Sequence, residues 1–415
     1  MSVPPPPKTL GRVLYHHRTQ GKGVEGVHIR SVIDALRAEG VKVDILSLPG
    51  ADPYATPKAM SPTAQARPWM KGVAYLPEPL FELAETAYNL VAGWRVWRIL
   101  RAQPGIELIY ERYALFMFST VLVARLRRVP IILEINDSAT VDRVRPLFFV
   151  SLAKAIERWT FAKASGLVFV SAAFRDRVSE ALGTEIAPTI ISHNAANIAQ
   201  FSFTPRQRED TRAKYGLSNS DIVCGYLGAF APWHFIDKFV YRVADQLALN
   251  PHLKLLLVGD GATFPDVQRF VEERGLGQQV LLAGRVPHDQ VPSLLSAMDM
   301  AVLPNAGDYT SPVKLFEFMA CGIAPIAPDF SPITEVLRED QTGWMFPNGN
   351  LDDAVDMVIA KSRNPSDLRR VGLAARDYIA TERQWRNNIL QLMELYSDIK
   401  LPHAGKNQAA TTAAK

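Results

Sequence analysis

The sequence predicts an α/β protein made of two doubly wound, Rossmann-like domains. Short apolar strands alternate with helices from residue 11 onward, and the alternation starts again near residue 222. Several strands are followed directly by glycine turns, as in parallel sheets that bind ligands at the carboxyl ends of their strands. At 415 residues, the chain is long enough for two such domains, each with its own core.

The first domain is expected over residues 1–205. A strand at 13–15, a loop containing Gly21, Gly23 and Gly26, a helix at 28–39 and a strand at 41–46 predict a parallel β-loop-α-β unit. These glycines do not match the dinucleotide-binding spacing, so no nicotinamide cofactor is expected. Further strands are predicted at 106–110, 129–134, 167–171 and 189–192, with helices at 79–102, 116–128 and 146–164.

The second domain is expected over residues 206–380, after a polar segment at 202–220 that we interpret as the boundary. A last helical region is predicted at 365–400, and a disordered tail at 403–415. Strands are predicted at 222–227, 253–258, 280–283, 300–303 and 323–327, with helices near 236–249, 263–274, 288–297 and 313–321.

Composition limits the class of protein. Hydrophobic residues make up 48% of the chain and charged residues 21%, which is typical of a globular protein, and no apolar run is long enough to predict a membrane span. The first residues lack the apolar core of a signal peptide, and the two cysteines lie in apolar stretches. We therefore expect a cytoplasmic chain with reduced thiols.

Charge is distributed unevenly along the chain. Residues 1–200 contain 24 Lys and Arg against 17 Asp and Glu, whereas the remaining residues contain 22 against 25. Near the end of the helix at 79–102, arginines recur every three residues beside Trp94 and Trp97. This pattern occurs at anionic membrane surfaces, and equally on a helix packed against a sheet with its arginine heads in water. Both interpretations remain open, and nucleic acid is not an expected partner.

The segment at 311–329 combines features suited to a phosphate-bearing ligand. Ser311 and Pro312 predict a helix start, where backbone N–H groups bind anions. Lys314 and Glu317 lie three residues apart and share a helix face. Gly322 ends the helix before a buried strand.

Three more glycine turns follow predicted parallel strands and should lie along the same rim. They are Gly228–His234, Val258–Gly261 and Gly284–Pro287. A single turn of this kind is weak evidence of a site, but together and in this order they are specific.

These blocks resemble the GT-B glycosyltransferases, and among them the large family-4 retaining group. The strongest match is the 311–322 segment, flanked by 257–261, 284–288 and 297–304. In the first half, the glycine loop, Tyr110–Tyr113 and Glu134–Asn136 resemble a bacterial subgroup that assembles polysaccharides or glycolipids. The resemblance implies a nucleotide-sugar donor in the second domain, an acceptor in the first, and a helix at 381–402 that crosses back to the first domain.

The resemblance also implies roles for individual residues. Lys314 and the N–H groups of Val313 and Leu315 would stabilise the leaving diphosphate without a metal ion or other cofactor. Glu317 would accept hydrogen bonds from ribose hydroxyls. Arg285 and the backbone of Val286 would face the base. Further donor contacts would come from Gly23, Gly26, Gly228, His234, Gly259 and Ser311.

The sequence departs from the family pattern at four positions. Tyr309 replaces the first of two glutamates in the donor motif, and Ala229 and His234 replace an arginine and a lysine that usually bind the diphosphate. If His234 were protonated, activity would depend on pH near neutrality. Asn136 stands where many relatives have a histidine; it is implied as a catalytic residue that positions a sugar hydroxyl but cannot act as a base.

Several alternatives remain open from the sequence. Arg112, Glu134 and Asp137 are either acceptor ligands or a structural ion-pair set, and His28 is either structural or catalytic. The main functional hypothesis is transfer of a sugar from a UDP- or GDP-sugar to a lipid-linked or polysaccharide acceptor at a membrane face. The rivals are a nucleotide-sugar-binding scaffold without turnover and a GT-B epimerase.

Overall fold

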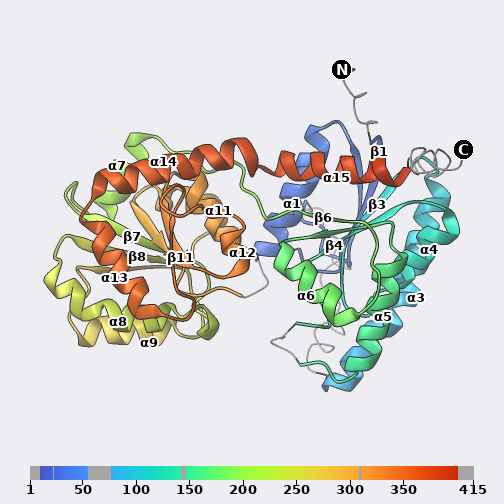
Figure 1. The fold of residues 1–415 in the computed structure, drawn as a ribbon, viewed down its shortest axis with the longest axis horizontal. Coiled ribbons are helices and arrows are strands. Elements are labelled where there is room, and N and C mark those ends of the chain that lie inside the picture. The colour runs from blue at the N-terminus through green and yellow to red at the C-terminus, as the bar shows by residue number, and fades with distance from the viewer. Residues whose placement is uncertain (1–9, 22, 55–75, 142–145, 308–310, 401–415) are drawn as a thin grey trace, which may run out of the picture. The chain divides into compact units, whose positions relative to one another are not determined.

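The computed structural model describes residues 10–21, 23–54, 76–141, 146–307 and 311–400, which form two compact units (Figure 1). Unit 1 runs to Ser192 and resumes at Trp385, and unit 2 is His193–Gln384. The expected boundaries at 205/206 and 380/381 differ from this division. His193 lies 3.4 Å from Glu335, and Asn194 is hydrogen-bonded to Ser311, so the chain already belongs to unit 2 at residue 193.

Unit 1 is built on a six-stranded parallel sheet with the order β2-β1-β3-β4-β5-β6. Its strands are short and apolar, and most of their side chains are buried on both faces, as expected for a parallel sheet covered by helices. The strands are β1 (Arg12–His16), β2 (Lys42–Leu46), β3 (Leu108–Arg112), β4 (Ile131–Ile135), β5 (Gly166–Phe169) and β6 (Thr189–Ile191).

The helices of unit 1 include the last helix of the described chain. This helix, α15, packs against α1, β5 and β6 (Figure 1). A Cβ atom on Gly166 would lie only 3.0 Å from Leu395, so the glycine lets α15 approach the sheet. The helices are α1 (Gly23–Ala38), α3 (Glu78–Ala102), α4 (Ser119–Arg127), α5 (Val150–Lys163), α6 (Ala172–Leu182) and α15 (Trp385–Lys400).

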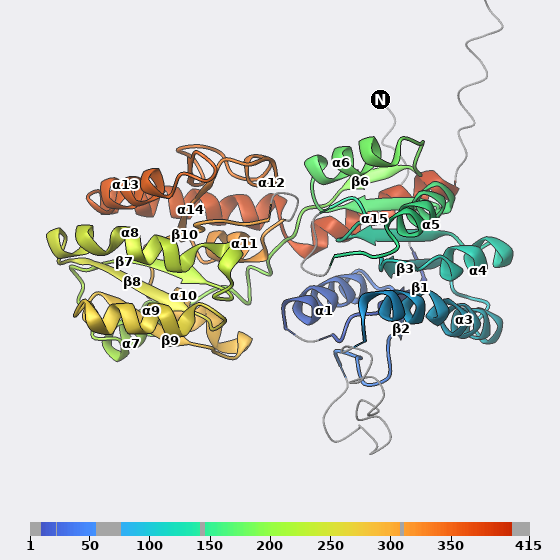
Figure 2. The same ribbon diagram turned by 90° about the horizontal axis from the view of Figure 1, so that it is seen from below.

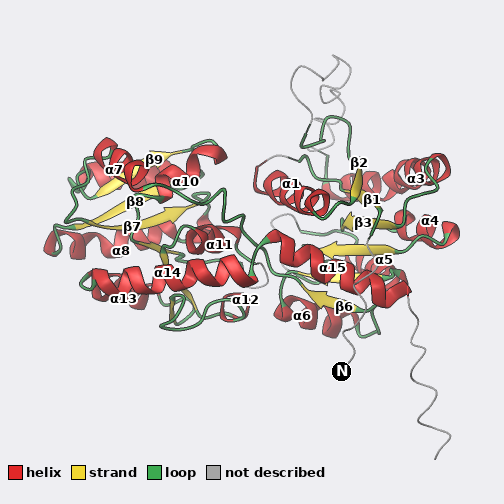
Figure 3. Ribbon diagram, turned by 90° about the horizontal axis from the view of Figure 1, so that it is seen from above, coloured by secondary structure: helices red, strands yellow, loops and turns green. Residues whose placement is uncertain are grey.

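Unit 2 is built on a second six-stranded parallel sheet, with the order β12-β11-β10-β7-β8-β9. Figure 3 shows β7, β8 and β9 of this sheet among the helices of the unit. Alternate residues of β8 enter two different cores: Leu256 and Val258 face one, and Leu255 and Leu257 the other. The strands are β7 (Ile222–Leu227), β8 (Leu253–Val258), β9 (Val280–Gly284), β10 (Met300–Val302), β11 (Ala324–Pro328) and β12 (Trp344–Phe346).

Helices supply the other side of each core in unit 2. Residues of α10 and α11 contribute to one core, residues of α8, α9 and α13 to the other, and residues of α14 to both. The α-helices are α7 (Pro205–Lys214), α8 (Ile236–Leu249), α9 (Phe264–Glu273), α10 (Val291–Leu295), α11 (Val313–Ala320), α12 (Ser331–Thr334), α13 (Leu351–Ser362) and α14 (Pro365–Glu382), and the short 3-10 helices are η1 (Pro232–His234) and η2 (His288–Gln290).

Two local predictions are corrected by the structure. The polar segment at 202–220 is not a linker but contains α7, which begins with a capping box between Thr204 and Gln207. The predicted glycine loop is shorter than expected, because α1 begins at Gly23 and therefore includes Gly26. A Cβ atom on Gly26 would collide with the carbonyl oxygen of Gly21, so this glycine is needed for close packing.

The C-terminal region predicted at 365–400 is two helices, α14 and α15. Elements β12, α12 and α13 were not predicted, while Tyr309 and the tail at 403–415 lie outside the described residues.

Each sheet has a point at which the strand order reverses, and open α/β sheets bind ligands at such points. In unit 1, the reversal lies between β1 and β3. In unit 2, it lies between β7 and β10. The predicted site residues of each unit gather near these positions.

Candidate active site

The start of α11 is fixed by a residue from the beginning of unit 2. The backbone N–H of Asn194 donates to the Ser311 hydroxyl at 3.1 Å, and its side-chain amide donates to the Ser311 carbonyl at 2.6 Å. The N-cap residue is Pro312, and no side chain caps the helix. Ser311 therefore stands at the predicted helix start without capping it, and its hydroxyl accepts a hydrogen bond from Asn194.

Backbone donors at the start of α11 are fewer than expected. The N–H of Leu315 donates to the Pro312 carbonyl at 3.0 Å, so it does not serve a phosphate as the sequence suggested. Val313 and Lys314 occupy the first turn, where N–H groups lack a partner within the helix and the helix dipole is positive. These two N–H groups remain suited to an anion.

The Lys314 ammonium lies over the carboxyl end of β7. Its Nζ atom is 4.8 Å from the centroid of the Tyr226 ring, within the range of a cation–π interaction. A Cβ atom on Gly228 would come within 2.5 Å of Nζ, so a side chain there would displace the lysine head from this position. Burial lowers the pKa of Lys314 to about 8 although Glu317 acts in the opposite direction, and the side chain is mainly cationic at pH 7.

His234 does not supply the second positive charge that the sequence allowed. Burial, together with the nearby Lys314 charge, lowers the pKa of His234 to about 4, so the ring is neutral near pH 7. Its Nδ1 atom lies 2.8 Å from the Ala229 carbonyl oxygen, which fixes the proton on Nδ1. The Tyr226 hydroxyl donates to the same oxygen at 2.8 Å.

The three glycine turns are hydrogen-bonded to one another, and the first of them lies against Lys314. The N–H of Gly228 donates to the Val258 carbonyl and that of Gly259 to the Gly284 carbonyl, both at 2.9 Å. A Cβ atom on Gly259 would collide with the carbonyl oxygen of Gly228. Gly259 is therefore required for packing between turns, a sufficient reason for glycine there besides the predicted approach of a ligand.

Glu317 is buried and is paired with a residue that we did not predict as part of the site. The His288 Nε2 atom lies 3.1 Å from a Glu317 carboxylate oxygen. His288 is the last residue of the block at 284–288 that the sequence analysis singled out. Its place in that block is the signal that could have marked it as a candidate. Arg285 is exposed, whereas Val286 is partly buried against the core.

The predicted residues of unit 1 form a buried polar cluster at the ends of β3 and β4. His28 is hydrogen-bonded to Glu134 and packs edge-on against Trp385 at 4.8 Å, and Arg112 lies 3.6 Å from the other Glu134 oxygen. Burial would raise the pKa of Glu134, but His28, Arg112 and Asn136 together outweigh it and lower the pKa to about 2.

These contacts favour the structural interpretation for Glu134 and His28. Glu134 is an ionised, paired carboxylate, and His28 is held by it. Arg112 Nη1 is buried and makes no hydrogen bond to any described residue, although it lies 3.6 Å from the Glu134 carboxylate as an ion pair. Asp137 instead accepts a hydrogen bond from the Ser138 N–H at 2.9 Å.

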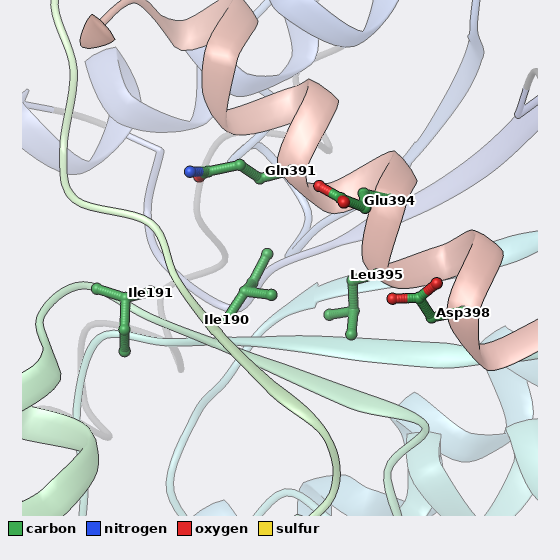
Figure 4. Close-up of a pocket in the computed structure, with 6 residues that line it drawn as sticks. All are labelled: Ile190, Ile191, Gln391, Glu394, Leu395 and Asp398. Carbon is green, nitrogen blue, oxygen red and sulfur yellow. The ribbon is translucent and has the colours of Figure 1, made fainter. Parts of the chain in front are cut away.

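A separate shallow pocket of about 400 Å³ lies between β6 and α15 (Figure 4). Ile190 and Ile191 form one side, and Glu394 and Asp398 of α15 lie on the other. Two carboxylates would repel an anionic nucleotide, so this pocket is not the expected donor site. Within the described residues, no group of three His, Cys, Asp or Glu side chains is placed to hold a metal ion.

Two consecutive Rossmann-like units with this rim of glycine turns define the GT-B class of glycosyltransferase. Two family models match the chain: the Glycosyl transferase 4-like domain over residues 25–195 and Glycosyl transferases group 1 over residues 207–378. The chain is therefore a GT-B glycosyltransferase of the family-4-like group.

Relatives and solved structures agree with this class. Alpha-D-kanosaminyltransferase of Streptomyces kanamyceticus is 22% identical over 349 residues, covering 80% of this chain and 88% of the relative. A GDP-mannose-dependent alpha-(1-6)-phosphatidylinositol monomannoside mannosyltransferase of Mycolicibacterium smegmatis is 24% identical over 242 residues, covering 56% of this chain and 62% of that relative.

The fold is shared with structures of low sequence identity. Anabaena HepE in complex with UDP superposes with a TM-score of 0.68 at 15% identity, covering 93% of this chain and 100% of that structure. A glycosyltransferase from Rickettsia africae gives a TM-score of 0.71 at 15% identity, covering 95% and 99%.

Proposed function

We propose that this glycosyltransferase takes a sugar from a UDP- or GDP-sugar bound in unit 2 and transfers it, with retention and without a metal ion, to a lipid-linked or polysaccharide acceptor. The observation that carries the proposal is the position of Lys314, whose ammonium lies over Gly228 at the strand-order reversal of unit 2. UDP is present in the solved structure of HepE, and one relative is named as GDP-mannose-dependent.

The proposed chemistry follows the charge that develops as the sugar leaves. Breaking the sugar–phosphate bond places negative charge on the diphosphate, which Lys314 and the first N–H groups of α11 can stabilise. Ala229 and the neutral His234 add no positive charge. Lys314 therefore carries a larger share of this stabilisation than it would beside an arginine and lysine pair.

Glu317 supports the proposal as the acceptor of ribose hydroxyls. A carboxylate that is buried and hydrogen-bonded to His288 is held in one orientation, which suits recognition of a diol. We assign Arg285 and the Val286 backbone to the base side. Val313 and Ser311 belong to the helix start.

Acceptor binding is assigned to the polar cluster of unit 1. Arg112, whose Nη1 atom has no hydrogen-bond partner among the described residues, would donate to a hydroxyl or anionic group, and Asn136 would position a sugar hydroxyl without acting as a base. Glu134 and His28 hold this cluster rather than react. The lipid or glycan nature of the acceptor, and a location at the cytoplasmic membrane face, stay predictions.

The deciding experiment is a donor screen with UDP- and GDP-sugars, measuring nucleotide release with and without added acceptors. Lys314→Ala and Glu317→Ala should each lower turnover by at least about a hundredfold. Lys238→Ala, an exposed lysine of the same unit, is the matched control and should retain activity. If neither site variant changed turnover, the assignment of this site would be wrong.

The same assay separates the remaining alternatives. A scaffold would show a thermal shift with UDP or GDP but no turnover with any sugar. An epimerase would change the sugar of the donor without releasing nucleotide. Proton NMR of the first product tests retention, and activity unaffected by EDTA would support a metal-independent reaction.

A further inference from the structure

Helix α3 has an outward face that is unusually apolar. Its buried side, which includes Ala92, Val96 and Leu100, packs within unit 1. The opposite stripe is exposed, with Leu90 at 81% and Trp94 at 59% of their maximum accessible surface. A surface helix normally keeps its apolar residues on the buried side only. The outward stripe of α3 consists of Leu80, Leu83, Leu90, Val91, Trp94 and Trp97.

The exposed apolar surface continues onto the neighbouring helices. Helix α4 lies beside α3 (Figure 2), and the Arg127 guanidinium of its last turn lies 5.1 Å from the Trp97 ring centroid. Leu126 of α4 is 65% exposed. At the other end of α3, Glu82 accepts hydrogen bonds from the backbone N–H groups of Phe148 and Phe149, which precede α5. The Phe148 side chain is exposed. We call this surface, formed by the outward residues of α3, α4 and α5, the α3–α5 face.

The helices of the α3–α5 face carry an excess of positive charge. Helices α3, α4 and α5 contain eight Lys and Arg but only four carboxylates. Glu82 and Glu157 are buried, and Glu85 is paired with Arg18 at 2.5 Å. The guanidinium of Arg98 stacks over Trp94 at 4.7 Å, so cations lie directly beside exposed indole rings. Arginine heads and tryptophan rings at the edge of an apolar stripe suit the boundary between lipid headgroups and acyl chains.

We propose that the α3–α5 face docks on an anionic lipid bilayer, with its tryptophans and leucines in the interface and its arginines on lipid phosphates. Charge complementarity favours this occupant over a second copy, because two copies of the same face would bring their cations together. No described helix is long and apolar enough to cross a membrane, so the contact would be peripheral. The inference deepens the proposed function by naming the surface that would hold the enzyme at a lipid-linked acceptor.

Vesicle binding tests the proposal without using the reaction. The full-length protein should cosediment with phosphatidylcholine vesicles that contain phosphatidylglycerol, and much less with phosphatidylcholine alone. Binding should weaken as salt is raised, and tryptophan fluorescence should shift to the blue. Trp94→Glu and Leu126→Glu should each weaken binding at least about tenfold, because they place a carboxylate on the docking face. Both positions are exposed, so the variants should fold.

Leu249→Glu is the matched control, since Leu249 is 76% exposed on α8 in unit 2, and it should bind vesicles like the wild type. Absence of binding to anionic vesicles at low salt would overturn the proposal. So would equal losses in Leu249→Glu, or a dimer of the wild type that dissociates in Trp94→Glu. Donor hydrolysis is measured without lipid, so a failure of lipid docking would leave the proposed reaction intact. Equally, an absence of donor hydrolysis would leave the vesicle-binding result unchanged.

Discussion

The Nε2 atom of His288 lies 3.1 Å from a carboxylate oxygen of Glu317. The other ring nitrogen lies 3.4 Å from the Gln200 side-chain amide, so a neutral ring can accept from Gln200 and donate to Glu317. The carboxylate is held in one orientation by a neighbour on a different element, η2. His288 is thus a positioning residue for Glu317.

Replacing His288 should weaken donor binding more than it slows the chemical step. We expect His288→Ala to raise the donor KM about tenfold, the effect of one lost hydrogen bond to a charged group, with a smaller change in kcat. His252→Ala is the control, because His252 is exposed and lies 3.4 Å from Asp221 in the same unit. A lower kcat with unchanged KM would contradict the positioning role.

Donor affinity should depend on the charge of Lys314. A lysine whose pKa is about 8 is cationic below that pH and becomes neutral above it, so UDP or GDP binding should weaken as pH rises. Between about pH 7 and about pH 9.5, where the charge of the diphosphate itself is constant, affinity should fall at least about tenfold. Calorimetric titration across this range provides the measurement.

Lys314→Met separates this effect from other groups. The variant keeps the apolar stem but has no charge, so its weaker affinity should be nearly independent of pH over the same range. A wild-type affinity that stayed constant up to pH 9.5 would show that Lys314 does not bind the diphosphate.

Replacing Gly228 should strain the backbone and displace the Lys314 ammonium. Its φ angle is +144°, and an added Cβ atom would lie 2.5 Å from the Lys314 ammonium. Gly228→Ala should lower the free energy of unfolding by about 1–3 kcal/mol and remove most nucleotide binding. Thermal unfolding with and without UDP measures both. Gly277→Ala is the control, since a Cβ atom there meets no atom within 4 Å, and it should behave like the wild type.

The buried Glu134 carboxylate should contribute to stability in a way that depends on pH. Its pKa is lowered from 4.5 to about 2 in the folded protein, so its contribution is complete above about pH 4.5 and is lost as pH falls toward 2. Glu134→Gln should be less stable at pH 7 by about 3 kcal/mol. Urea unfolding at several pH values should show the difference between the two proteins narrowing below about pH 4.5. A difference that stayed constant down to pH 3 would contradict this role.

Much of the local structure could be predicted from residue patterns. Strands β7 and β8 and helix α8 were predicted at the bounds observed, because continuous apolar runs and a strong apolar stripe leave few alternatives. Segments 202–220 and 331–362 were harder. The polar stretch forms α7, which begins with a capping box, and the short strand β12 pairs with β11 and buries Trp344 and Phe346. Neither signal has the periodicity on which prediction depends.

The candidate site shows the same division. The glycine turns, Lys314 and Glu317 could be placed on one rim of unit 2, because parallel strands present their carboxyl ends at the same edge. The partners of these residues could not be assigned. The pairing of Asn194 with Ser311 and of His288 with Glu317 joins residues 117 and 29 positions apart.

The sequence alone determined that the chain is a two-domain α/β protein with a helix start suited to an anion. Strand and helix periodicity and the backbone freedom of glycine act over a few residues, so they can be recognised without the fold. Only the tertiary structure decided which groups are charged and which donors are used. Burial beside Lys314 makes His234 neutral. The Leu315 N–H donates to the Pro312 carbonyl, and His28 with Arg112 keeps Glu134 ionised. Desolvation and contacts between distant residues set these states, because the pKa of a side chain depends on its three-dimensional surroundings.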